Sequence, residues 1–221
     1  MIRTLALLLL AAITAPAFAQ PGVPVDGKAL VEALRKGGHV VYFRHTKTLP
    51  EHAHEAKMRR EGRWRLDDCA TQRNLSEAGY LEAKKQSEAL DKLGIPYGNA
   101  WASQACRTRI HAEFVVQKFA FADALTPLRN KEKAQAVRRM LNTPPPEGTN
   151  TFLFAHGGIL WMATDYDSVE AETFVFRPST GGGPPALVAA IRIEDWDRLL
   201  RGERCCAPRA FWGGKGEPQV D

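Results

Sequence analysis

The sequence predicts an α/β domain of three layers, with helices covering both faces of a mostly parallel central sheet. Short apolar runs of β-type residues alternate with amphipathic runs along the chain, which is typical of sheets whose strands are connected by helices. The run His39–Phe43 is nearly all apolar, as expected for a strand buried on both faces. No internal repeat or linker divides the chain, so residues 20–221 are expected to form one domain.

The elements of the first half follow from periodicity and end signals. Residues 26–36 carry apolar side chains at helical spacing and stop at two glycines, which predicts a short helix before the strand at 39–43. Residues 46–73 are polar and basic without a clear period. They are expected to form a long excursion, partly helical around 51–63, and long excursions are often functional. Ser76 begins a strong helix that Gly94 ends.

The second half continues the alternation of strands and helices. Apolar runs, stop signals and helical spacing define its elements. We expect strands at Ala100–Ser103 and Thr151–Ala155, helices at Arg107–Phe119 and Lys131–Leu141, and a final pair of strands at Thr173–Phe176 and Leu187–Ile193.

The first 19 residues are expected to be a secretory leader and not part of the fold. Arg3 gives a positive start, Leu5 to Ile13 form an apolar stretch, and Ala17-Phe18-Ala19 has the pattern of a cleavage site. The apolar stretch is too short to span a bilayer, which argues against a membrane anchor. We therefore expect a periplasmic or secreted protein, without stable membrane insertion after cleavage.

The charge balance does not favour a nucleic-acid partner. Removing the leader removes one cation, Arg3, and no acid, so 29 cations remain against 25 acids. This excess is small and its cationic runs are interrupted by acids, unlike a basic nucleic-acid surface. No Cys/His spacing of a zinc site occurs either. We expect neither a metal nor a cofactor.

Four cysteines suit disulfide bonds in an exported protein. Cys205 and Cys206 are adjacent and are not expected to bond to each other without strain. Bridges from this pair to Cys69 or Cys106 are therefore considered. The sequence does not choose the connectivity.

Charged side chains follow three of the predicted strands. Arg44-His45 follows the first strand, His156 follows the strand at 151–155, and Arg107 lies at a helix start after the strand at 100–103. Ligands of open α/β sheets bind at the carboxyl ends of the strands, and helix N-termini favour anions. Guanidinium groups bind phosphate with two parallel hydrogen bonds. The sequence therefore predicts a phosphate site where these strand ends meet.

Four landmarks between residues 39 and 158 resemble, in order, those of the histidine phosphatase superfamily, which includes phosphoglycerate mutases and bacterial phosphohistidine phosphatases. They are Phe43-Arg44-His45-Thr46, Leu75-Ser76-Glu-Ala-Gly79, Ser103-Gln-Ala-Cys-Arg107-Thr108 and Phe154-Ala-His156-Gly157-Gly158. The segment 172–178 and a closing strand that reaches Trp196 also look like small exported bacterial members. The resemblance implies a phosphoglycerate mutase-like fold.

The resemblance also implies an activity. His45 would accept a phosphoryl group from a small phosphorylated substrate, and water would then hydrolyse the phosphohistidine. Arg44, Arg107 and His156 would surround the phosphate and offset its charge in the transition state. Because these cations are side chains, no metal is needed.

Three further residues are candidates for binding the substrate. Thr46 stands where the family has glycine, so it narrows the pocket while adding a hydroxyl donor. Arg73 precedes a predicted helix start and is expected either to point into the pocket or to lie at the surface. Ser103 belongs to the Ser-x-x-x-Arg landmark.

The general acid is not obvious. Family members often take it from the region after the second arginine, and there Asp123 in a predicted loop is favoured, with Glu172 as a second candidate. If neither serves, a substrate with a good leaving group, such as phosphohistidine or an acyl phosphate, would need no acid.

Two further hypotheses remain open. Thr46 and the missing obvious acid favour a non-catalytic module that binds a phosphate or phosphoglycan on the same fold. Cys69 and Cys106 flank segments that should converge on the pocket, and a bridge between them would pin the excursion to the loop of the second arginine.

Overall fold

A computed structural model describes residues 22–50, 52–179 and 181–208. The expected leader, residues 1–19, lies outside the described residues. The helices are α1 (Gly27–Lys36), α2 (His52–Arg60), α3 (Glu77–Leu93), α4 (Cys106–Val115), α5 (Lys131–Asn142), α6 (Gly157–Thr164) and α7 (Asp195–Leu200), with short 3-10 turns η1 (Cys69–Thr71) and η2 (Asp123–Leu125). The strands are β1 (Val40–Arg44), β2 (Tyr97–Ala102), β3 (Ala120–Phe121), β4 (Asn150–Ala155), β5 (Thr173–Arg177) and β6 (Ala186–Ile191).

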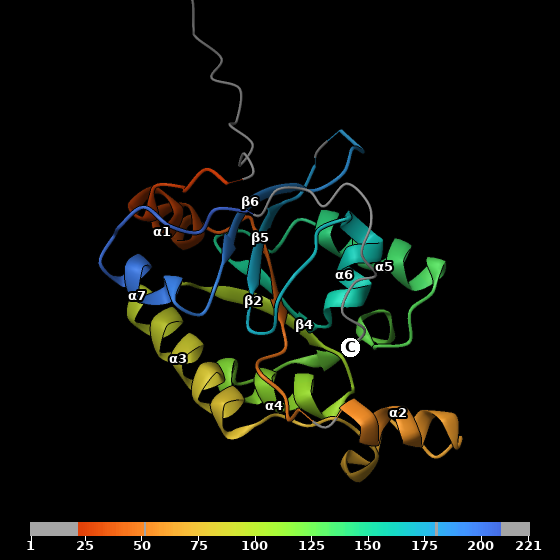
Figure 1. The fold of residues 1–221 in the computed structure, drawn as a ribbon. Helices are drawn as coiled ribbons and strands as arrows, with labels where there is room; N and C mark the ends of the chain where they lie inside the picture. Colours follow the sequence, from red (N-terminus) through yellow and green to blue (C-terminus); the bar gives the residue numbers. More distant parts are fainter. Residues whose placement is uncertain (1–21, 51, 180, 209–221) are drawn as a thin grey trace, which may run out of the picture.

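The predicted α/β class and mostly parallel sheet are confirmed. The strands lie in the order β3-β2-β4-β1-β5-β6. The pairs β3–β2, β2–β4 and β4–β1 are parallel, whereas β5 is antiparallel to both β1 and β6. Because β2, β4 and β1 are parallel neighbours, their carboxyl ends meet at one edge of the sheet (Figure 1).

Two apolar cores, one on each face, make the sheet the middle of three layers. Val41 and Phe43 of β1 face α1, α3, α4 and α7, whereas Val40 and Tyr42 face α5 and α6. This alternation follows from the two-residue period of a strand. Figure 1 shows the two helix layers on opposite sides of the strands. Every residue of β1 and β4 is buried, as the apolar run predicted.

Cap signals read from the sequence place several helix ends correctly. The Asp26 side chain accepts the N–H of Ala29 at the start of α1. The Ser76 hydroxyl accepts the N–H of Gly79 at the start of α3, and Gly94 ends that helix in the left-handed conformation with φ 62°.

Several elements differ from the prediction. Strand β3 was not predicted, and α4 ends at Val115 instead of at Phe119. Trp196, expected in a closing strand, lies in α7 and is buried against the first core. Helix α6 was not predicted, because it begins with two glycines and its apolar residues have no helical period. A helix packed on most of its sides shows no amphipathic stripe, which hides it from periodicity.

The cysteines form two disulfides, one of which corrects the expectation. Cys69 bonds to Cys106, as hypothesised, with 5.7 Å between their Cα atoms. Cys205 and Cys206 bond to each other instead of to the first pair. The expectation that adjacent cysteines would not pair was wrong because the backbone of Cys206 adopts φ 64°, in the left-handed region that non-glycine residues rarely occupy.

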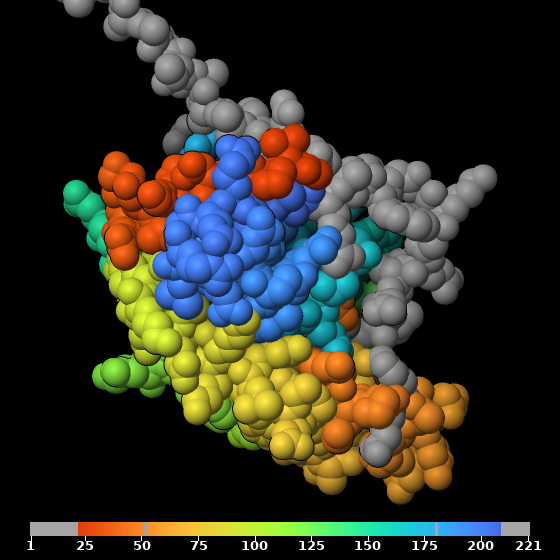
Figure 2. Space-filling model, turned by 60° about the vertical axis from the view of Figure 1, so that its left-hand side comes forward, coloured from red at the N-terminus to blue at the C-terminus, as the bar shows by residue number. Residues whose placement is uncertain are grey.

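The excursion at 46–73 projects from the body of the molecule. Its helix α2 extends beyond the compact layers in Figure 1, and Figure 2 shows the orange segment as a projection beside α3. Helix α2 falls inside the range predicted as partly helical. None of the helices within residues 22–50, 52–179 and 181–208 has the length and apolar character needed to cross a membrane.

Candidate active site

The sheet register brings the two predicted histidine segments side by side. Arg44, the last residue of β1, is paired with Ala155, the last residue of β4, so His45 and His156 leave the sheet together. Their ring centroids are 5.3 Å apart, and both side chains are buried. The two strands that precede these histidines are therefore neighbours, so the strand ends meet as the predicted phosphate site requires.

The hydrogen bonding of His45 determines its tautomer. Its Nδ1 lies 3.0 Å from the carbonyl oxygen of Thr46. A carbonyl oxygen only accepts hydrogen bonds, so Nδ1 carries the hydrogen and the neutral ring has its lone pair on Nε2. A neutral imidazole with this tautomer is prepared to act as a nucleophile through Nε2.

His156 contacts Ser103, and the glycine that follows His156 contacts Arg44. The Nε2 atom of His156 lies 3.0 Å from the hydroxyl of Ser103, at the end of β2. The guanidinium of Arg44 lies against Gly157, where an added Cβ would come within 2.8 Å of its Nη1. A larger residue at position 157 would therefore displace the arginine, which explains the glycine in this landmark.

Arg107 and Arg73 approach the same region from the other side. Arg107 lies in the first turn of α4, is buried, and donates from Nη1 to the carbonyl oxygen of Arg73 at 3.4 Å. Arg73 is also buried, so its surface alternative is wrong. The first turn of α4 provides the positive end of a helix dipole, which favours an anion.

Two carboxylates that the sequence did not single out contact this cluster. Glu55 of α2 accepts from Arg107 at 3.2 Å, and Glu170 lies 3.5 Å from Arg73 and 4.0 Å from Nδ1 of His45. Glu170 also accepts from the hydroxyl of Thr48 at 2.6 Å. No landmark covers either acid, because both reach the site through tertiary contacts of loops and of the excursion.

Both carboxylates are held in the ionised form. Burial alone would raise the pKa of Glu170, but the electrostatic effect of the nearby His45 ring, the Thr48 donors and Arg73 together outweigh it, and the pKa lies below its ordinary value. Burial likewise opposes the shift at Glu55, whose pKa is lowered chiefly by Arg107 and the N–H of Arg73. Groups that stay ionised at neutral pH are poor proton donors.

The remaining candidates lie in different environments. Thr46 is buried, and its hydroxyl makes no hydrogen bond with the described residues. The side chain of Asp123 is 76% exposed and pairs with the amine of Lys133 at 3.0 Å. Glu172 is buried and accepts from the backbone N–H of Val169 at 2.9 Å. The roles of Asp123 and Glu172 as acids stay predictions.

A further cation lies in the segment after η2. The side chain of Arg129 lies against Gly158, where an added Cβ would come within 2.7 Å of its Cδ. Gly158 is two residues after His156 in the chain, and Arg129 is exposed. It was missed because it stands in an irregular, polar stretch with no motif around it.

Comparison with known proteins supports the fold through structure and not through sequence. No protein-family model and no curated protein sequence matches the chain. A solved protein histidine phosphatase, SixA complexed with tungstate, matches with a TM-score of 0.53 at 12% identity, covering 71% of this chain and 98% of its own.

Two further solved structures match less closely. Phosphoserine phosphatase from Entamoeba histolytica, in complex with phosphoserine, has a TM-score of 0.44 at 11% identity, over 69% of this chain and 95% of its own. Phosphoglycerate mutase from Thermus thermophilus has a TM-score of 0.40 at 16% identity, over 69% and 97%. The sheet order, the two helix layers and the match to SixA give one conclusion: this chain has the fold of the histidine phosphatases.

Proposed function

We propose that this chain is a metal-independent phosphatase that uses His45 as its nucleophile. The observation that carries the proposal is the 3.0 Å contact between Nδ1 of His45 and the carbonyl oxygen of Thr46, from which the tautomer follows, in a ring that lies 5.3 Å from that of His156. A site that only binds phosphate does not require a histidine held in its nucleophilic tautomer.

The reaction would proceed in two steps. The Nε2 lone pair of His45 forms a bond to phosphorus while the bond from phosphorus to the leaving oxygen breaks, and the leaving group departs with that electron pair. Water then forms a bond to phosphorus, the N–P bond breaks, and inorganic phosphate and a proton are released. Arg44, Arg107 and His156 offset the charge on the equatorial oxygens during both transfers.

The substrate class follows from the acids around the site. Glu55 and Glu170 have lowered pKa values, and Asp123 is exposed and paired with Lys133. If neither Asp123 nor Glu172 donates a proton, catalysis favours leaving groups that depart without prior protonation. We therefore infer a preference for aryl phosphates, acyl phosphates or phosphohistidine over simple alkyl phosphates.

An exported location is part of the proposal. The leader pattern at residues 1–19 supports it, and so does the Cys69–Cys106 disulfide, since such bonds persist in oxidising compartments. Fractionation of a tagged full-length chain would test it. Recovery of the uncleaved chain from the cytoplasm would contradict it.

Replacing the nucleophile tests the enzyme proposal. His45→Ala should lower kcat for p-nitrophenyl phosphate by at least about 10³-fold, because no covalent intermediate forms. His54→Ala is the matched control, since His54 is exposed and its Nε2 contacts only a backbone carbonyl among the described residues, that of Ala70. Wild-type protein that binds phosphate but hydrolyses nothing would favour the non-catalytic binding module instead.

A further inference from the structure

The excursion inserts a buried carboxylate next to the phosphate-binding arginines. Oε2 of Glu55 accepts from Nη1 of Arg107 at 3.2 Å and from the backbone N–H of Arg73 at 2.8 Å. Its other oxygen, Oε1, accepts from Nε and Nη2 of Arg59 at 3.0 and 2.6 Å. Four donors therefore hold both oxygens of a carboxylate that has little contact with solvent.

The two oxygens of Glu55 face different parts of the molecule. Oε2 contacts two residues of the site, and Oε1 contacts a residue of the excursion itself. Arg59, in turn, lies with its guanidinium carbon 3.9 Å from the centre of the Trp64 ring. Glu55 thus connects the outer helix α2 with the arginines at the sheet edge.

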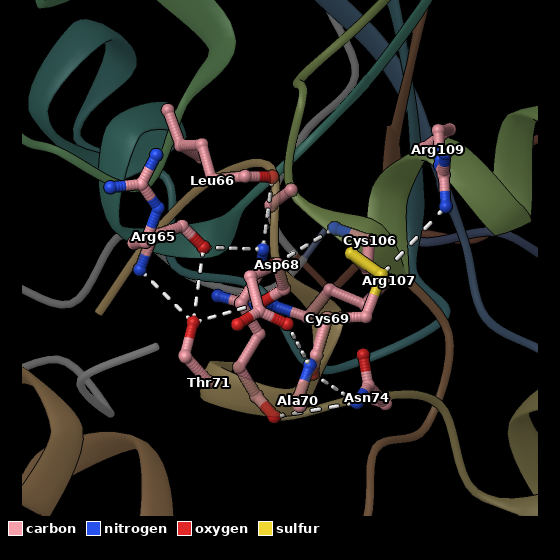
Figure 3. The surroundings of a disulfide bond; sticks show 12 residues. Arg65, Leu66, Asp68, Cys69, Ala70, Thr71, Asn74, Cys106, Arg107 and Arg109 are labelled. Atoms are coloured by element: carbon pink, nitrogen blue, oxygen red, sulfur yellow. Dashed lines mark hydrogen bonds between the residues drawn. A yellow bond between two sulfur atoms is a disulfide. The ribbon is translucent and has the colours of Figure 1, made fainter. Parts of the chain in front are cut away.

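The excursion is also fixed to the residue that precedes Arg107. The Cys69–Cys106 disulfide joins the two segments covalently, as Figure 3 shows beside Arg107. The side-chain oxygen of Gln72 accepts the backbone N–H of Cys106 at 2.9 Å. The start of α4 is therefore held by a disulfide and by a hydrogen bond from its backbone to Gln72. Glu55 in turn holds the guanidinium of Arg107.

We propose that Glu55 is a positioning residue, which holds the guanidinium of Arg107 and the backbone at Arg73 in the arrangement that binds the phosphoryl group. This inference rests on the proposed function for its kinetic part, because Arg107 is assigned to phosphate binding there. Glu55 does not touch the reacting atoms in this role. It acts through Arg107.

A competing account makes the opposite prediction. If Glu55 only opposed incoming anions by its negative charge, removing that charge would strengthen phosphate binding. If it positions Arg107, removing the charge lets the guanidinium leave its place, and phosphate binding weakens. The direction of the change therefore decides between positioning and repulsion.

The test compares Glu55→Gln with the wild-type protein and with Glu61→Gln. Glu61 follows α2 in the same excursion, and its carboxylate pairs with the exposed Arg63. Titration calorimetry with inorganic phosphate measures binding without turnover, and p-nitrophenyl phosphate gives KM and kcat. We expect the Kd for phosphate and KM to rise on the order of tenfold in Glu55→Gln, with a smaller change in kcat and no change in Glu61→Gln. An unchanged or lower Kd for phosphate would overturn the proposal.

A double-mutant cycle separates positioning from a general effect on folding. In an Arg107→Gln background, Glu55→Gln should change the Kd for phosphate by much less than tenfold, because only its contact with the backbone N–H of Arg73 remains. A full tenfold effect in that background would contradict the proposal. If Glu55→Gln does not fold, Arg59→Gln replaces it, because Arg59 is partly exposed and holds the other oxygen of Glu55. Its loss should also raise the Kd for phosphate, by a smaller factor. An unchanged Kd would count against positioning.

These outcomes distinguish the inference from the proposed function. Wild-type protein without hydrolysis would end the phosphatase proposal, yet the calorimetric Kd would still test Glu55. If the wild-type protein is active and Glu55→Gln has the same Kd for phosphate and the same KM, only the inference about positioning fails.

Discussion

The strand ends and the excursion meet at one site but are held in place by different interactions. His45 and His156 follow two neighbouring strands in which every residue is buried, so the backbone of the core fixes them. The excursion at 46–73 is held by the carboxylate of Glu55, one disulfide and a few polar links. We therefore expect His45, the proposed nucleophile, to keep its place after loss of the excursion better than the arginines that we propose bind phosphate.

The largest expected effect concerns the core beneath the strand ends. Burial, with a smaller electrostatic contribution from His45, lowers the pKa of His111 to about 3. In the unfolded chain its pKa is near 6.5, so the unfolded state takes up a proton between pH 6.5 and about 3 and the folded state does not. Stability should therefore fall as the pH falls through this window, by up to about 4–5 kcal/mol from this residue.

His111→Gln should remove that dependence. Nε2 of His111 lies 2.6 Å from the side-chain oxygen of Gln86, and a glutamine at 111 retains a donor for it. The free energy of unfolding, measured with urea at pH 7 and pH 4, should drop less in the variant than in the wild-type protein. Equal drops in both would show that His111 takes up its proton in the folded state.

A second, smaller effect should follow from releasing the excursion. The Cys69→Ser/Cys106→Ser variant lacks a bridge between residues 37 apart in sequence, and loses about 2–4 kcal/mol of stability. KM for p-nitrophenyl phosphate should rise more than kcat falls, because the arginine loop loosens while His45 stays on the sheet. Steady-state kinetics and a melting curve measure both.

The second disulfide provides the control for this variant. Cys205→Ser/Cys206→Ser breaks a bond between neighbours that closes no long loop, so KM should stay unchanged. The separation of the two regions would be contradicted if Cys69→Ser/Cys106→Ser turned over substrate about a hundredfold more slowly at saturation while its KM stayed unchanged.

The smallest expected effect is that of Asp123→Asn. Its carboxylate is exposed and paired with Lys133, so we expect kcat to change less than about twofold, on phenyl phosphate as well as on p-nitrophenyl phosphate. If Asp123 donates a proton, phenyl phosphate, which has the poorer leaving group, will lose about 10²-fold in rate. That result would restore Asp123 as the general acid and remove the inferred preference for good leaving groups.

The sequence predicted what local pattern encodes. The apolar runs of β1 and β4, the ends of α3 at Ser76 and Gly94, and the charged residues after the strands all lie where the sequence pattern placed them. Helix α6 was not predictable in this way, because a buried apolar run has no period that separates a helix from a strand. Trp196 was misplaced because α7 has only six residues, too few to show a helical period.

Only the site residues that follow the strand ends were predictable from the sequence. Arg44, His45 and His156 follow the ends of their strands, and the register brings them together. Glu55 and Glu170 reach the same site through tertiary contacts of polar segments. Glu55 could have been suspected only from its place on an excursion that begins directly after His45.

The central claim is that His45 carries the phosphoryl group, and the most direct test is to find that group on the protein. Wild-type protein is mixed with p-nitrophenyl phosphate, quenched in alkali within milliseconds and mapped by mass spectrometry, with His156→Ala included to slow hydrolysis of the intermediate. We predict one phosphate, on the peptide that contains His45. Phosphate on another residue, or turnover with no phosphorylated peptide in either protein, would contradict the account.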